Sequence, residues 1–212
     1  RDRYAGLESF LCRKLFEGPV EAVLRAEAVD RGSLPLKGDE PGLAEMLSRA
    51  VRRGKLSAGT SFDTLGDRTA VFVCVDTPVG PERRPDYSGL EAAVRDVARN
   101  VRKGTLVVVE STLAPGTMLG MVAETLERES GLRVGKDLKL AHCPERVMPG
   151  REYVASIRDF WSVCSGVNDR ARERVTAFLS DVLNVEQYPL TVLDRPLESE
   201  TCKIVENSYR AT

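Results

Sequence analysis

The chain has 212 residues, of which 42% are hydrophobic and 30% charged, the proportions of an ordinary globular protein. Its 31 basic and 32 acidic residues nearly cancel, so no net field favours nucleic acid or a membrane surface as a partner. No apolar run approaches the ~20 residues of a membrane span, and we expect a cytoplasmic protein. Five widely spaced cysteines and one histidine predict reduced thiols and no metal site.

Short apolar runs alternate with helical patterns from residue 70 onwards. The segments 70–75, 105–109, 138–142 and 161–165 predict buried strands, and 185–190 is a fifth candidate. Helical spacing predicts helices over 88–104, 115–131, a stretch around 175–182, and 199–211. Ser88 and Glu91 form a capping-box pattern at the start of the first of these helices. Before residue 70 the pattern is ambiguous, because 20–29 fits either a strand or a helix.

This alternation predicts an α/β fold: a doubly wound, mostly parallel, Rossmann-like sheet that is short at its N-terminal end. We assign residues 1–196 to this domain and residues 197–212 to the start of a connecting helix.

Polar clusters follow three consecutive predicted strands. They are Asp76-Thr77-Pro78, Glu110-Ser111-Thr112 and Cys143-Pro144-Glu145-Arg146. Open α/β sheets bind ligands at the carboxyl ends of their strands, so we expect these clusters to form one rim. His142 would be the last residue of its strand and face away from Cys143. We interpret it as a hydrogen-bonded, partly buried histidine, and Cys74 and Cys143 as packing residues.

Several segments resemble the UDP-glucose/GDP-mannose dehydrogenase family, with UDP-N-acetylmannosamine dehydrogenases the most similar branch. In chain order they are "RGSLPLKGDEPGLAEML", "VFVCVDTPVG", "KGTLVVVESTLAPGTM", "SGLRVGKDLKLAHCPERVMPGR" and "ETCKIVENSYR". The resemblance implies NAD-dependent oxidation of the C6 alcohol of a nucleotide sugar, of the UDP-N-acetylhexosamine type, to the uronic acid. It also implies a homodimer formed through the C-terminal helix.

The resemblance assigns roles around the cofactor. Thr77 and Pro78 would line the dinucleotide, and Ser111 and Thr112 the nicotinamide end. Glu145 would lie near the nicotinamide and the reacting carbon.

The resemblance also assigns the substrate side. Arg146 would hold the loop or bind the nucleotide sugar. Lys203 and Asn207, four residues apart on one helix face, would approach the substrate oxygen and stabilise charge that develops there. We therefore expect Glu145, Lys203 and Asn207 to converge near Thr112 as the catalytic group.

Two departures from the family pattern leave a second hypothesis open. In "RDRYAGL", Arg1 and Arg3 stand where the family has glycines that approach the pyrophosphate, which predicts little or no NAD affinity. The family's Gly-Gly-x-Cys motif with the catalytic cysteine is absent. The chain is then either a truncated dehydrogenase or a non-catalytic descendant that acts as a binding or scaffolding domain.

Overall fold

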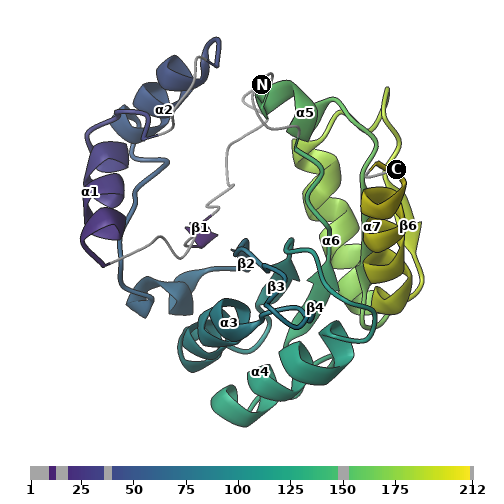
Figure 1. Cartoon of the computed structure of the whole chain (residues 1–212). Coiled ribbons are helices and arrows are strands. Elements are labelled where there is room, and N and C mark those ends of the chain that lie inside the picture. Colours follow the sequence, from purple (N-terminus) through teal and green to yellow (C-terminus); the bar gives the residue numbers. More distant parts are fainter. Residues whose placement is uncertain (1–9, 13–18, 36–39, 148–152, 211–212) are drawn as a thin grey trace.

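The computed structural model describes residues 10–12, 19–35, 40–147 and 153–210, and six strands of this part form one sheet (Figure 1). The strands lie side by side in chain order: β1 (Phe10–Cys12), β2 (Ala70–Val73), β3 (Leu106–Val109), β4 (Lys139–His142), β5 (Val163–Gly166) and β6 (Thr191–Leu193). All neighbours except β4 and β5 pair in parallel. The predicted mostly parallel, Rossmann-like α/β fold is confirmed.

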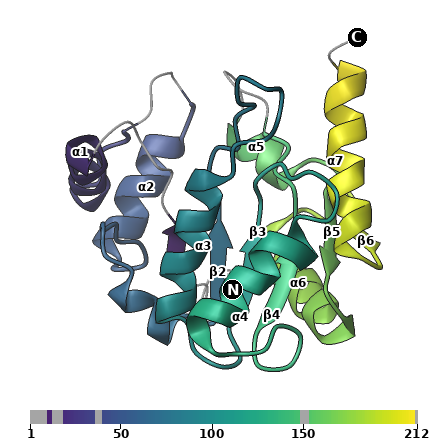
Figure 2. The same cartoon turned by 60° about the horizontal axis from the view of Figure 1, so that its bottom comes forward.

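The helices cover both faces of this sheet. They are α1 (Pro19–Asp30), α2 (Leu43–Arg52), η1 (Asp63–Asp67), α3 (Ser88–Asn100), η2 (Met118–Val122), α4 (Ala123–Ser130), α5 (Tyr153–Arg158), α6 (Asp169–Val182) and α7 (Pro196–Arg210). Figure 2 shows α3 and α4 in front of the sheet and α6 on its other side. No helix in the described part is long and apolar enough to cross a bilayer.

Strand alternation divides the core into two layers. Val71 and Val107 point to the face covered by α3 and α4, whereas Phe72 and Val108 pack under α6. Every residue of β2 and β3 is buried because both faces of the sheet are covered. This burial explains why the strands appear in the sequence as continuous apolar runs rather than as alternating ones.

The antiparallel pairing of β4 and β5 was not anticipated. A parallel neighbour requires a connection that crosses back over the sheet, whereas β4 ends and β5 begins at the same end of the sheet, and the described part of their connection contains the short helix α5. β6 runs parallel to β5 and therefore antiparallel to β2, β3 and β4, so it finishes at the end of the sheet where those three strands begin. Helix α7 starts at that end and runs back past the carboxyl ends of the three parallel strands (Figure 2).

Three local predictions were wrong or left open. The segment 185–190 forms turns, and the strand lies at Thr191–Leu193. The ambiguous stretch 20–29 is part of helix α1. Ser88 does not cap α3: instead its N–H donates to Asp86 Oδ1 at 2.9 Å, and Glu91 pairs with Arg95.

Residues 1–9, including the predicted glycine-turn positions Arg1 and Arg3, lie outside the described part of the chain. The division of the chain after residue 196 stays a prediction.

Candidate functional site

The loops that follow β2, β3 and β4 are joined across the carboxyl edge of the sheet. Thr77 Oγ1 donates to the carbonyl of Thr112 at 2.8 Å. The N–H of Glu145 donates to the carbonyl of Glu110 at 3.1 Å. Thr77 and Thr112 are half-buried, and Pro78 and Glu145 are exposed. The three polar clusters therefore form one continuous rim.

Ser111 connects two loops of this rim through hydrogen bonds. Its buried hydroxyl donates to the carbonyl of Val75 at 2.7 Å and accepts the N–H of Val75 at 3.0 Å. Because both hydrogen bonds fix the β2 loop against the β3 loop, the hydroxyl of Ser111 is occupied by the protein itself.

His142 lies in the interior beneath the rim. Its side chain is fully buried, with Nε2 3.2 Å from the carbonyl of Ser111 and Nδ1 2.7 Å from Ser199 Oγ. A carbonyl can only accept, so Nε2 carries the proton and Nδ1 is an acceptor that faces Ser199 Oγ, whose hydroxyl also lies 2.9 Å from the carbonyl of Pro196. Burial lowers the pKa of His142 to about 4, although the hydrogen bond to Ser111 opposes this shift. His142 is a neutral, hydrogen-bonded core residue, as expected, but it is more deeply buried than predicted.

A small cavity adjoins the rim. It has a volume of about 150 Å³ and lies between the strand ends, α5 and α6. Its lining combines apolar walls, such as Phe72 and Phe178, with the carboxylates Glu110 and Glu145 and the guanidinium of Arg146. Burial raises the pKa of Glu110, and the charge of Glu145 adds to this effect, while a hydrogen bond from Cys74 Sγ at 2.9 Å opposes it.

Cys143 also lines this cavity, and its chemistry is that of a packing residue. Burial raises the pKa of its thiol well above the ordinary value, and the charge of Glu110 acts in the same direction. A thiol held in its protonated form is a poor nucleophile.

Arg146 connects the β4 loop to helix α7. Its guanidinium pairs with Glu206 at 2.8 Å and lies 5.2 Å from the ring centroid of Phe160. Glu206 also pairs with Arg210 at 2.7 Å, which makes a half-buried charge network. The Nε atom of Arg146 is buried and finds no hydrogen-bond partner among the described residues.

Lys203 reaches the rim from α7. Only 9% of the residue is exposed, and Nζ donates to the carbonyl oxygen of Glu145 at 2.6 Å. Burial lowers the pKa of Lys203, whereas the carboxylates of Glu206 and Glu145 raise it. Lys203 and Glu145 are thus in contact, as expected, although through the main chain of Glu145. Asn207 lies one turn further along α7 and is exposed.

Two neighbouring residues of α7 were missed by the sequence analysis. Glu200 is fully buried, and its carboxylate accepts the N–H groups of Gly116 and Met118, each at 2.7 Å. Ser199 Oγ lies 2.7 Å from both His142 Nδ1 and Ser165 Oγ. On a helix, an acid three residues before a lysine suggests a surface ion pair, so no local signal identifies these long-range contacts.

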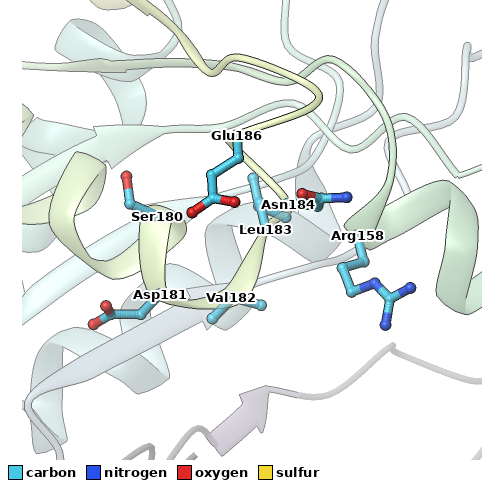
Figure 3. Close-up of a pocket in the computed structure, with 7 residues that line it drawn as sticks. All are labelled: Arg158, Ser180, Asp181, Val182, Leu183, Asn184 and Glu186. Carbon is cyan, nitrogen blue, oxygen red and sulfur yellow. The ribbon is translucent and has the colours of Figure 1, made fainter. Parts of the chain in front are cut away.

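A larger groove of about 520 Å³ lies where α6 ends and shares Val182 and Leu183 with the smaller cavity (Figure 3). Figure 3 shows Asp181 and Arg158 at its two ends and Glu186 between them. None of the predicted site residues lines this groove. Within the described residues, no group of three or more histidine, cysteine or acidic side chains could hold a metal ion.

Fold and rim together define the class of protein: a Rossmann-like α/β domain with its polar groups gathered at the carboxyl ends of parallel strands. The chain belongs to the UDP-glucose/GDP-mannose dehydrogenase family, because the profile of that family's NAD binding domain matches residues 24–179.

Individual relatives agree with this assignment. The chain is 33% identical over 171 residues to UDP-N-acetyl-D-mannosamine dehydrogenase of Pyrococcus horikoshii, which covers 81% of this chain and 39% of that protein. It is 32% identical over 196 residues to the Escherichia coli K12 enzyme of the same name, covering 87% and 43%. Among solved structures, NDP-N-acetyl-D-galactosaminuronic acid dehydrogenase of Methanosarcina mazei superposes with a TM-score of 0.82 at 34% identity, covering 93% and 41%. The chain thus spans about two fifths of the length of these relatives.

Proposed function

We propose that this chain is the cofactor-binding part of an NAD-dependent dehydrogenase that oxidises C6 of a UDP-N-acetylhexosamine-type nucleotide sugar to the uronic acid. The observation that carries the proposal is the contact of Lys203 with Glu145 across 58 residues of sequence. It brings the helix assigned to the substrate side onto the rim assigned to the cofactor side.

The rim offers groups suited to the nicotinamide end of NAD. Bound NAD would supply the hydride acceptor. The oxidised nicotinamide ring is flat and cationic, which matches apolar walls such as Phe72 and Phe178 beside the carboxylates of Glu110 and Glu145. The guanidinium of Arg146 lines the same cavity and adds a positive charge beside these carboxylates. In this arrangement Thr77, Pro78, Ser111 and Thr112 form the edge along the dinucleotide.

Lys203 and Asn207 would serve the substrate. An ammonium group has three donors, and Lys203 uses one of them for the carbonyl of Glu145. The remaining donors, with the amide of Asn207, would stabilise negative charge on the C6 oxygen as its proton is removed. Of the two roles considered for Arg146, its pairing with Glu206 supports holding the loop.

Titration of the chain with NAD by calorimetry tests the proposal. We expect saturable binding with a dissociation constant above the low micromolar range, because Arg1 and Arg3 replace glycines. Glu145→Gln should weaken binding several-fold and reduce any preference for the oxidised over the reduced dinucleotide. Glu124→Gln, an exposed substitution on α4, is the matched control. Absence of saturable binding, or equal binding by Glu145→Gln, would favour the non-catalytic alternative.

A further inference from the structure

Helix α7 is held to the sheet by polar contacts. Its buried residues are Pro196, Ser199, Glu200 and Lys203, so only the proline is apolar. Apolar packing tolerates small sliding movements, whereas hydrogen bonds depend on distance and angle. A shift of α7 by one residue would move each buried side chain by about 1.5 Å and 100°. The register of α7 is therefore set by these polar side chains.

Glu200 makes the strongest of these contacts. Its carboxylate accepts the N–H groups of Gly116 and Met118, where the helix that continues as α4 begins. The first N–H groups of a helix have no partner within it, and the helix dipole favours a negative charge at this end. Burial raises the pKa of Glu200, and the backbone N–H groups at this helix start lower it. No cation pairs with Glu200 among the described residues. Its negative charge is therefore stabilised by the N–H groups and the dipole at this helix end.

Ser199 adds a second attachment beside the first. It connects α7 to His142 at the end of β4 and to Ser165 in β5. Two consecutive residues of α7 thus fix the helix to the β3 loop, to β4 and to β5. Lys203 follows less than one turn after Glu200, on the same buried side.

We infer that Glu200, supported by Ser199, is the positioning residue that sets the register of α7 and so delivers Lys203 to Glu145. The same carboxylate fixes the start of the helix that follows Thr112, so it joins the cofactor side of the rim to the substrate side. The importance of Glu200 for catalysis rests on the proposed function of Lys203. The effect of Glu200 on the position of Lys203 does not depend on that proposal.

The reactivity of the Lys203 amine tests this inference without requiring activity. The chain is treated with an amine-acylating reagent over the titration range of lysine, and the labelled peptides are quantified by mass spectrometry. In the parent chain Lys203 should react far more slowly than the exposed Lys136. Glu200→Gln removes the charge and leaves a single acceptor, so the plateau rate at Lys203 should rise at least about tenfold, as expected from loss of a charge-assisted hydrogen bond.

The pH profile separates positioning from a general loss of stability. Release of Lys203 from its buried position should move its titration midpoint upward, because burial is the main cause of its lowered pKa. Glu124→Gln, which removes an exposed acid from the first turn of α4, should leave both the rate and the midpoint unchanged.

Ser199→Ala provides an independent variant in case Glu200→Gln does not fold. It should also raise the acylation rate and the titration midpoint of Lys203, but by less than Glu200→Gln does. A lower melting temperature with an unchanged Lys203 profile in these variants would overturn the inference. NAD binding plays no part in either readout, so failure of the proposed function would leave this result interpretable.

Discussion

At the residue scale, the rim depends on side chains whose chemistry is changed by burial. His142 and Glu110 occupy neighbouring strand ends, and burial disfavours the charged form of each. His142 is neutral because burial disfavours its charged form, and both of its nitrogens have hydrogen-bond partners inside the protein. Glu110 lines a cavity next to Glu145, where a ligand cation would compensate both carboxylates.

The histidine provides a direct test, because it is the only one in the chain. Its pKa is about 4 in the folded protein, compared with 6.5 for an ordinary histidine. The unfolded chain therefore binds the proton more tightly. Stability should be complete above pH 6.5 and fall as the pH drops towards 4, by up to about 3 kcal/mol. Proton NMR of the single imidazole should show titration near pH 4. A midpoint at the ordinary value would contradict the buried network.

At the element scale, the close approach of β5 to α6 depends on Gly166. A Cβ atom at this position would lie 2.9 Å from the carbonyl carbon of Ala171, in the first turn of α6. Because the obstacle is backbone, neither element can yield without moving the other. Gly166→Ala should lower the free energy of unfolding by at least about 2 kcal/mol, measured by denaturant titration.

Gly59→Ala is the control for this substitution. No atom lies within 4 Å of the Cβ that would be added at Gly59. This variant should differ from the parent chain by less than about 0.5 kcal/mol. Equal stability of the two variants would show that β5 and α6 can separate without cost.

At the scale of the whole molecule, α7 stands at one side of the molecule (Figure 1), and several of its apolar residues are exposed. Val205 is 62% and Tyr209 83% exposed, and Leu197 and Ile204 are also exposed on this helix. The homodimer suggested by the family resemblance would bury this surface. We propose that two copies associate through it.

Substitution of Val205 tests this association. Val205→Lys should convert a dimer into a monomer in sedimentation equilibrium, because a charged side chain would have to be buried at the contact. Val79→Lys is the matched control, since Val79 is 70% exposed on the loop after β2. A parent chain that is monomeric at high micromolar concentration would refute the proposed dimer.

The sequence by itself determined the strands β2, β3 and β4, the gathering of Thr77, Thr112 and Glu145 at one edge, and the family. Strands that are buried on both faces have continuous apolar sequences, and the carboxyl ends of parallel strands lie at the same end of the sheet. These properties depend on neighbouring residues, so local patterns reveal them.

Only the tertiary structure decided the direction of β5, the path of α7, and the contacts of Ser199 and Glu200. These contacts join residues 34 to 84 positions apart. An acid or serine on a helix has the same local pattern whether it faces solvent or a distant helix end. Whether such a residue is buried, and which partner it meets, depends on the path of α7 past the rim. That path follows from the directions of β5 and β6, which hydrophobic periodicity along the chain does not reveal.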